Sequence, residues 1–321
     1  MDHLWDVGGA KHLSELQLSE LKPPINITWK RGKDMPFMMS YYPDIAVLKE
    51  IVYVGGGGLP IVNMGTETHT VMMYDIQRDN WKMLPPYSFY WFSLTVLNDQ
   101  LVLVGGVDED DERTNKLGVL DDKAQWTHPF PPMPTARSGA TVVTHSNRWL
   151  VAAGGYNEFC DSGSEVEIFD LSVRQWYRGT SLPIEGYKMS STIIKNTWYI
   201  LGGFTYETTD REVLCVNLND LIIQAISQRP TSSPSTEWYI LPSTPLVRST
   251  ALALNGALLA VGGELEGSAV CLYEPRCRRW NKVEELLSER EQCACTVLPC
   301  GKVFIVGGAT EQVHIGTLEK L

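Results

Sequence analysis

Six histidines and seven cysteines are the residues of this chain that could bind a metal or act as nucleophiles. The histidines are dispersed singly, and no two of them have the spacing of metal ligands. Cys293 and Cys295 alternate within an apolar run, so on a strand they would face the same side. A zinc site would need a Cys-x-x-Cys pair and a second pair, and the sequence has neither. We therefore interpret the cysteines as small buried thiols and expect no metal and no cofactor.

Two further motifs bear on chemistry. The run Gly55–Gly58 could cradle a phosphate, but Leu59-Pro60 follows it where a phosphate loop has Lys-Ser/Thr and a helix start. The sequence has no Gly-x-Ser-x-Gly elbow of a serine hydrolase. A Ser-His-Asp triad assembles in space and has no fixed spacing, so an enzyme stays open as an alternative. We expect no catalytic residues.

Composition excludes several classes of partner. The chain has 38 acidic and 27 basic residues, a net charge of −11, which argues against nucleic acid as the main partner. No apolar run reaches the roughly 18 residues of a membrane span, and Met1–Leu4 does not begin a secretory signal. An odd number of scattered cysteines agrees with a reducing compartment. We expect a cytoplasmic protein without a membrane partner.

Glycine doublets recur along the chain at nearly constant spacing, each after a short hydrophobic run. They begin at Gly8, Gly56, Gly105, Gly154, Gly202, Gly262 and Gly307. A fixed period of this size indicates one supersecondary unit stacked repeatedly. A repeat architecture also favours recognition of a partner over chemistry in a single cleft.

Each period has the same order of signals. A strand, a tight turn such as Asn255-Gly256 and a second strand precede the doublet. A third strand then ends in an aromatic-acid pair such as Tyr74-Asp75, with Trp81 and a proline-rich exit after it. This order predicts a four-stranded antiparallel blade, and blades bury one another in a ring, a β-propeller. Glycine in the doublet could let an aromatic ring pack against bare backbone.

The hydrophobic run into Gly-Gly, the aromatic-acid pair and the following Trp together resemble the Kelch repeat. The resemblance covers nearly the whole chain. The fourth full repeat departs from the pattern, with Asn217-Leu218 where an aromatic residue is expected. Its Trp238 comes late, after the polar stretch Ser227–Thr236, which we interpret as an extended loop. We expect no helix of useful length to interrupt the strands.

Five repeats are complete, and the two ends of the chain supply the parts of another. Gln292–Leu318 provides three strands, and Ile27–Trp29 provides the missing outer strand with its Trp. We therefore expect an all-β, six-bladed Kelch-type β-propeller of four-stranded antiparallel blades, with the last blade closed by an N-terminal strand. Residues 1–22 are then an N-terminal extension or partial repeat, and residues 23–321 form the propeller. Seven blades are the alternative.

The links between blades and the loops after the doublets should lie at one rim, because antiparallel strands reverse direction at each turn. Kelch-like proteins hold partners on that face, as the resemblance implies. Alignment on the strand that precedes each hairpin gives a partner-binding set of seven residues: Tyr42, Trp91, Arg137, Lys188, Arg248, Arg290 and Gln292. Arg137-Ser138 and Arg248-Ser249 match the Arg-Ser pair that peptide-binding Kelch domains aim at carboxylates. Replacing both arginines is expected to weaken partner capture and to leave stability unchanged.

Acidic residues follow several doublets and should gather on the same face. We call them the acidic rim: Asp108, Glu109, Asp110, Asp111, Glu112, Glu207, Asp210, Glu264 and Glu266. A rim of this charge would steer basic partners toward the face and repel acidic ones.

These features together favour a non-catalytic protein–protein interaction module. It is expected to be a monomeric propeller that binds a protein or peptide on the face formed by the loops after the doublets and the inter-blade links. One alternative is a Kelch-type propeller enzyme, such as a sugar-acid epimerase or an oxidase-like protein. Another is the substrate-recognition part of a ubiquitin ligase adaptor that lacks its BTB domain.

Overall fold

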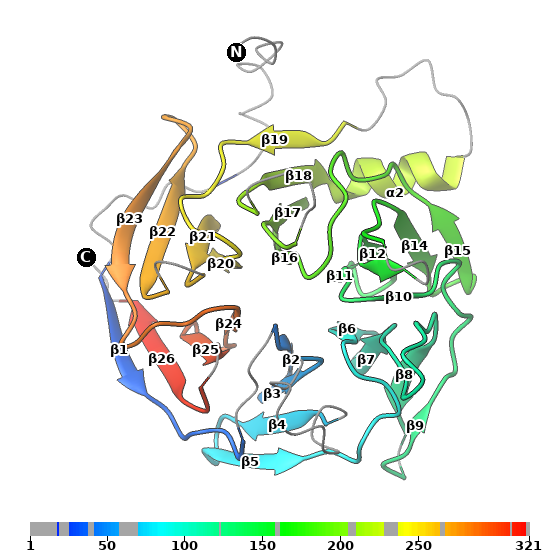
Figure 1. The fold of residues 1–321 in the computed structure, drawn as a ribbon, viewed down its shortest axis with the longest axis horizontal. Helices are drawn as coiled ribbons and strands as arrows, with labels where there is room; N and C mark the ends of the chain where they lie inside the picture. Colours follow the sequence, from blue (N-terminus) through cyan, green and yellow to red (C-terminus); the bar gives the residue numbers. More distant parts are fainter. Residues whose placement is uncertain are drawn as a thin grey trace.

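The computed structural model describes residue 18 and residues 26–37, 42–57, 70–121, 123–157, 161–204, 210–227, 237–263, 267–308 and 310–318. Within these residues the chain forms six sheets of four antiparallel strands, arranged around a central axis (Figure 1). The predicted six-bladed, all-β propeller is confirmed, and the seven-blade alternative is wrong. Of the extension predicted for residues 1–22, only Leu18 is described; it packs against the core between the fourth and fifth blades.

The blades are numbered along the chain, and in each blade the first strand is the innermost and the fourth the outermost. Blade I contains β2 (Asp44–Leu48), β3 (Ile51–Gly55), β4 (Met72–Asp75) and β5 (Asn80–Met83). Blade II contains β6 (Ser93–Leu97), β7 (Gln100–Val104), β8 (Leu117–Leu120) and β9 (Trp126–Thr127). Blade III contains β11 (Thr141–His145), β12 (Trp149–Ala153), β14 (Val166–Asp170) and β15 (Gln175–Arg178).

The second half of the ring has the same strand order. Blade IV contains β16 (Ser190–Ile194), β17 (Thr197–Leu201), β18 (Val213–Asn217) and β19 (Tyr239–Leu241). Blade V contains β20 (Thr250–Leu254), β21 (Ala257–Val261), β22 (Ala269–Glu274) and β23 (Arg279–Glu285). Blade VI contains β24 (Cys293–Val297), β25 (Val303–Gly307), β26 (Val313–Leu318) and β1 (Ile27–Arg31). A short ribbon of β10 (Arg137–Ser138) and β13 (Tyr156–Asn157) lies above blade III.

Blade VI joins the two ends of the chain, as the sequence predicts. Strand β1 pairs with β26 in antiparallel register, with Trp29 opposite Gly316 (Figure 1, blue beside red). A Cβ on Gly316 would collide with the ring of Trp29, so glycine here makes room for the tryptophan. The pairing covers the edge of β26, and β1 becomes the outermost strand of the blade.

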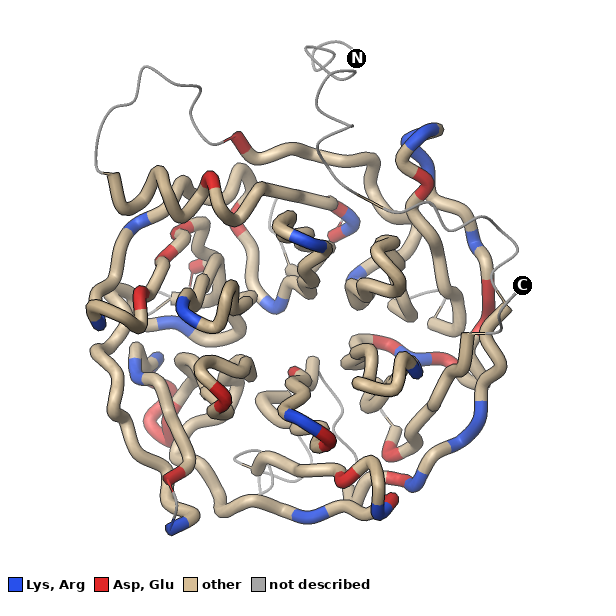
Figure 2. Tube along the Cα trace, turned by 180° about the vertical axis from the view of Figure 1, so that it is seen from behind, with Lys and Arg blue, Asp and Glu red and all other residues tan. Residues whose placement is uncertain are grey.

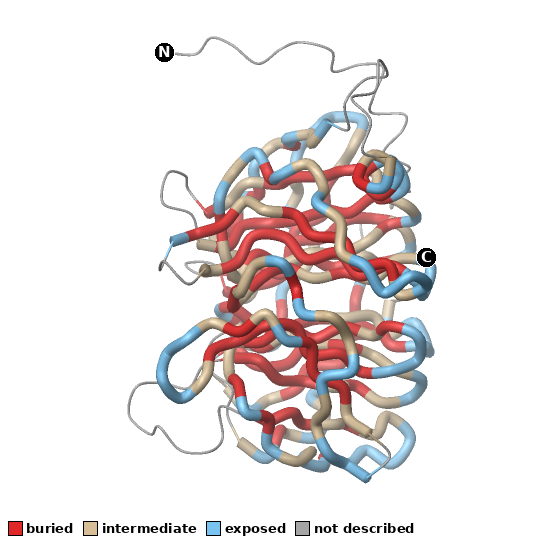
Figure 3. Tube along the Cα trace, turned by 90° about the vertical axis from the view of Figure 1, so that its right-hand side faces the viewer, coloured by how far each residue is buried: buried red, intermediate tan, exposed pale blue. Residues whose placement is uncertain are grey.

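Tryptophans on the outermost strands connect neighbouring blades. In five blades the indole Nε1 donates a hydrogen bond, 2.8–3.1 Å long, to a backbone carbonyl near the exit of the preceding blade. The donors and acceptors are Trp81 to Lys33, Trp126 to Pro85, Trp176 to Pro131, Trp238 to Thr180 and Trp280 to Pro242. The late Trp238 therefore keeps the position of its equivalents. Buried residues fill the strand layer between two loop faces (Figure 3).

In the five complete repeats, the first glycine of the doublet approaches the backbone that leads into the next blade. Gly105 and Gly262 have φ of 65° and 64°, and a Cβ on either would collide with the carbonyl oxygen of Arg137 or Arg290. The next glycine donates its N–H to that same carbonyl, as in Gly263 to Arg290 at 3.0 Å. At these sites a backbone carbonyl, and not the aromatic ring expected from the sequence, requires the glycine.

A helix interrupts the strands in the described residues, and the sequence-based expectation of none is wrong. Helix α2 (Leu218–Ser227) directly follows β18 and covers the outer side of blades III and IV (Figure 1). The side chain of Asn217 accepts hydrogen bonds from the N–H groups of Asn219 and Asp220, which caps the helix N-terminus. Leu218, Leu221 and Ile222 are buried against the core. No helix in the described residues is long and apolar enough to span a bilayer.

Two arginines of the predicted partner-binding set are buried inside blades. Arg137 is 1% exposed; its Nη1 donates to the carbonyls of Gly154 and Glu165, and its Nη2 lies 3.0 Å from the Glu167 carboxylate. Arg290 is 0% exposed and its Nη1 donates to the carbonyls of Gly307 and Gln312. Both guanidinium groups thus hold a doublet to the following strand. Burial removes both residues from the surface on which a partner could dock.

The glycine doublets generate a stability prediction with an internal control. Gly262→Ala should lower the free energy of unfolding by about 3 kcal/mol or more, because the methyl group meets the Arg290 carbonyl and the backbone must shift. Gly301→Ala should cost only about 1 kcal/mol, because Gly301 has a similar φ of 80° but nothing within 4 Å of an added Cβ. Chemical denaturation of both variants measures the difference. Equal losses would show that the close approach is unimportant.

The arginines generate a second prediction, which reverses the one made from the sequence for Arg137. Arg137→Ala should destabilise the fold by about 3–5 kcal/mol, because it leaves the buried Glu167 carboxylate without its cation. Arg248→Ala should cost about 1 kcal/mol, because the Arg248 side chain is 21% exposed. Thermal and chemical melts of the two single variants test this contrast. A stable Arg137→Ala protein would refute the clamp.

Candidate functional site

A central cavity runs along the propeller axis. Its volume is about 500 Å³, and the innermost strands of all six blades line it. We call the loop face that carries the inter-blade links and the loops after the doublets the doublet face. Backbone pairs such as Tyr90 with Val107 and Tyr187 with Phe204 join links to loops, which confirms that both lie on this face.

Short polar side chains connect neighbouring blades around the wall of this cavity. Ser93, Thr141 and Thr250 donate hydroxyl hydrogen bonds of 2.6 Å to the innermost strand or link of the next blade. Asp44 accepts from the N–H of Leu94 at 2.7 Å and from that of Ile45 at 2.8 Å. Burial raises the pKa of Asp44 to about 6 against the opposing effect of those two donors. This belt holds the innermost strands in register.

One left-handed residue stands at the start of each innermost strand, where the link enters the mouth of the cavity. The six residues have φ between 49° and 58°: Tyr42, Trp91, Gly139, Lys188, Arg248 and Gln292. Five of them belong to the partner-binding set predicted from sequence. In blade III the left-handed residue is Gly139, two positions after Arg137, so the prediction of Arg137 at this position is wrong. Gln292 is largely buried, and the other four long side chains are half-buried.

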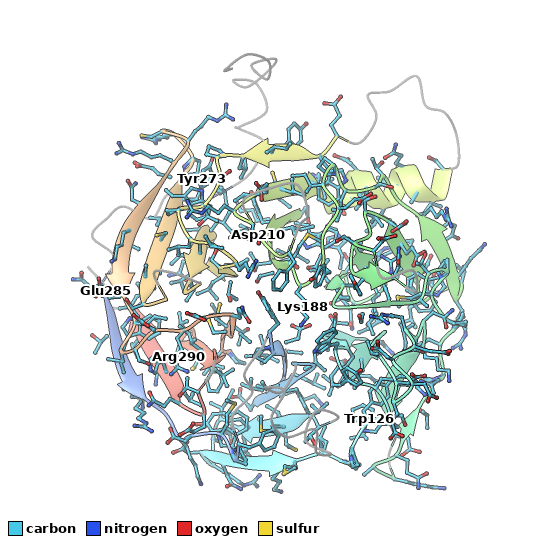
Figure 4. The ribbon with its side chains drawn as sticks, in the orientation of Figure 1. Trp126, Lys188, Asp210, Tyr273, Glu285 and Arg290 are labelled. Atoms are coloured by element: carbon cyan, nitrogen blue, oxygen red, sulfur yellow. The ribbon has the colours of Figure 1, made fainter. Side chains whose placement is uncertain are left out.

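Side chains from opposite blades meet across this mouth. The Lys188 Nζ lies 3.9 Å from the centre of the Trp91 ring and 4.9 Å from that of Tyr42. The ring of Tyr42 lies 5.2 Å from that of Phe204. We call Tyr42, Trp91, Lys188, Phe204 and Arg248 the mouth cluster. Figure 4 shows Lys188 near the propeller axis. Burial lowers the pKa of Lys188 to about 8.

Several aromatic residues of this face were missed by the sequence analysis. The ring of Tyr187 stacks on that of Phe204 at 5.0 Å and lies 5.1 Å from that of Tyr156. Tyr90 precedes Trp91 in the link, and their ring centres are 5.9 Å apart. Their positions within the repeat could have identified them. Each one directly precedes a left-handed residue or directly follows a doublet.

Arg248 has an acidic partner within the chain. Its Nη2 lies 2.7 Å from the Asp210 carboxylate, and its guanidinium lies over the Phe204 ring at 3.9 Å. Asp210, which the sequence places in the acidic rim, is 8% exposed and therefore contributes little charge to the surface. Lys188 makes no ion pair with any described carboxylate. Lys188 is therefore the cation of the mouth cluster whose charge is held by aromatic rings alone.

The other residues of the acidic rim that the structure describes lie in one loop of blade II. The Asp108 carboxylate accepts from the N–H groups of Asp110 and Glu112, at 3.0 and 2.9 Å, which orders the turn. Glu109, Asp110, Asp111 and Glu112 are exposed. Glu207, Glu264 and Glu266 lie outside the described residues. On the opposite face, acidic and basic residues are interspersed around the ring (Figure 2).

The described part of the chain offers little for metal chemistry. It contains no group of three or more His, Cys, Asp or Glu side chains that could hold a metal ion. Cys215, Cys293 and Cys295 are buried free thiols, and burial raises the pKa of Cys215 to about 12. Thiols with pKa values this high are poor nucleophiles.

Comparison with known proteins agrees with this architecture. The family model of the KLHDC2/KLHL20/DRC7 Kelch-repeats domain matches residues 42–228 and 91–308. Kelch-like protein 40 of Mus musculus is 33% identical over 170 residues, which are 51% of this chain and 27% of that protein. Acyl-CoA-binding domain-containing protein 5 of Arabidopsis thaliana is 24% identical over 245 residues, 68% of this chain and 37% of that protein.

A solved structure shows the same fold at low identity. The structure of YjhT superposes with a TM-score of 0.69 and 14% identity, covering 90% of this chain and 97% of that one. The chain spans about a quarter to somewhat over a third of the length of the curated relatives, and the family match covers most of the described residues. This protein is therefore a member of the Kelch-repeat family.

Proposed function

We propose that this propeller is a non-catalytic interaction module that binds a protein or peptide at the mouth cluster. The observation that carries the proposal is backbone strain at the mouth. Tyr42, Trp91, Lys188 and Arg248 are held at φ of 49–54°, a conformation that is unfavourable for bulky side chains. Gly139 shows that the fold accepts glycine at this position. Retaining long side chains at strained positions is typical of functional sites.

The chemistry of the mouth cluster fits a partner with an apolar or aromatic anchor. Trp, Tyr and Arg are the residues that contribute most to binding at protein interfaces. Here Trp91, Tyr42 and Phe204 converge on one mouth, and Lys188 and Arg248 are spread over their rings. Because Asp210 already neutralises Arg248, an acidic group of the partner would meet Lys188 first.

The exposed acids of the blade II loop add a second feature of the partner. Tyr90 of the adjoining link lies 3.4 Å from the Asp111 carboxylate, so the loop borders the mouth cluster beside Trp91. A negative loop beside an aromatic mouth suits a partner segment with basic residues next to its anchor. The buried free thiols support placing this interaction in a reducing compartment such as the cytoplasm.

Replacing Trp91 with glycine tests the mouth cluster separately from the fold. Trp91→Gly should leave the free energy of unfolding within about 1 kcal/mol, because relief of the left-handed strain offsets the lost half-buried packing. Binding of a partner identified by affinity capture and peptide mapping should weaken at least tenfold. The measurement is titration calorimetry with purified proteins.

Val173→Ala is the matched control, because Val173 is 57% exposed in the turn between β14 and β15, on the face opposite the mouth. It should bind with the affinity of the unchanged protein. Full affinity in Trp91→Gly would reject the mouth cluster as the docking site.

The acidic loop should act on the association rate. In a Glu109→Gln and Asp110→Asn variant, association with the same partner should slow and lose part of its salt dependence, while dissociation stays unchanged. Stopped-flow binding at several ionic strengths measures this. An unchanged association rate, or a faster one, would contradict the steering role.

A further inference from the structure

Blade III contains a complete buried polar triad. Thr135 donates its hydroxyl to Glu167 Oε1 at 2.6 Å, and Arg137 Nη2 lies 3.0 Å from Glu167 Oε2. Both side chains of the ion pair are 1% exposed. The Arg137 charge, which is needed to hold Gly154 and Glu165, is thereby neutralised inside the blade.

Blade VI repeats this triad with one decisive change. Arg290 takes the place of Arg137. Its Nη1 donates to the carbonyl of Gly307, the first glycine of the doublet, and to that of Gln312, two residues before His314. His314 takes the place of Glu167. In the sheet, His314 pairs with Ile305 and Glu167 pairs with Ala152. Each of these partners lies two residues before the first glycine of its doublet. Ser288, two residues before Arg290, lies 3.4 Å from His314 Nε2.

The change from glutamate to histidine removes the carboxylate that pairs with the buried arginine in blade III. Nε and Nη2 have no hydrogen-bond partner among the described residues in either arginine, but Arg137 Nη2 lies beside the Glu167 carboxylate, whereas Arg290 makes no ion pair with a described carboxylate and His314 Nδ1 has no hydrogen-bond partner there. Arg290 is 0% exposed and His314 is 1% exposed. A water molecule could accept from these groups but would leave the guanidinium charge uncompensated. A buried charge without a counter-charge is strongly destabilising.

The nearby carboxylates do not replace the missing one. Asp34 and Glu311 both act on the charge of Arg290, but neither forms an ion pair with it. Asp34 is instead paired with Arg31 at 2.6 Å. Arg31 also adds positive charge beside His314, opposite which it lies in the sheet. Burial, with the two arginines, lowers the pKa of His314 to about 4, so the imidazole stays neutral at physiological pH.

We propose that Arg290 and His314 form a binding site for a small inorganic anion of the chloride type, buried in the blade that closes the ring. The anion takes the part that the Glu167 carboxylate plays in blade III, as counter-charge to the guanidinium. Because β26 and β1 of this blade come from the two ends of the chain, the anion contributes to the stability of the closure.

A change of salt, combined with exchange of the glutamate and histidine between the two triads, tests the site. At constant ionic strength, replacing isethionate with chloride should raise the melting temperature of the unchanged protein by about 2 °C. His314→Glu supplies the carboxylate internally, so its melting temperature in isethionate should be higher and should no longer respond to chloride. Glu167→His, made in blade III, should enlarge the response to chloride.

Two results of the melting experiments would overturn the proposal. One is an equal melting temperature of the unchanged protein in both salts, and the other is a chloride response that persists undiminished in His314→Glu. A crystal of the unchanged protein grown in sodium bromide gives a direct readout that does not depend on the folding of any variant. An anomalous peak beside Arg290 Nη2 is the expected result, and a water molecule or no density there rejects the site.

Discussion

The close approach of the glycine doublets of blades II, III and V to the next blade is the constraint on which the rest of this structure depends. The carbonyl of Arg137, Gly186 or Arg290 accepts the N–H of the second glycine of the preceding doublet at 2.9–3.0 Å. A side chain on the first glycine would occupy the place of that carbonyl. The accepting residue lies two positions before a left-handed residue of the mouth. Blade packing and the geometry of the mouth are therefore fixed by the same backbone contact.

This coupling explains why the mouth can hold strained residues. The links are fixed on both sides, by the doublet of the preceding blade and by the belt of Ser, Thr and Asp side chains below. Tyr42, Trp91, Lys188 and Arg248 thus stay in a left-handed conformation that they would not adopt alone. Their side chains are pre-organised over the cavity, which would lower the entropy lost on docking of the proposed partner.

The sequence predicts the fold well because the signals repeat, and it predicts the site less well because site residues differ between blades. Gly-Gly spacing and the Trp positions were enough for six blades and for closure through Ile27–Trp29. The Arg-Ser pair placed Arg137 at the position that Gly139 occupies, because the left-handed φ that marks this position cannot be read from the sequence. Helix α2 replaces a short connection and has no counterpart in the described parts of the other repeats. The burial of Arg290 and Asp210 depends on strands distant in sequence, which a single repeat does not reveal.

The central claim is that a partner binds this Kelch protein at the mouth of the cavity on the doublet face. Hydrogen–deuterium exchange of the propeller, free and bound to a captured partner, tests this most directly. The account predicts slower exchange in the links around Trp91 and Lys188 and in the loop Asp108–Glu112, and unchanged exchange in the turns of the opposite face, such as that at Val173. Protection confined to the opposite face, or to the outer surface of α2, would contradict it.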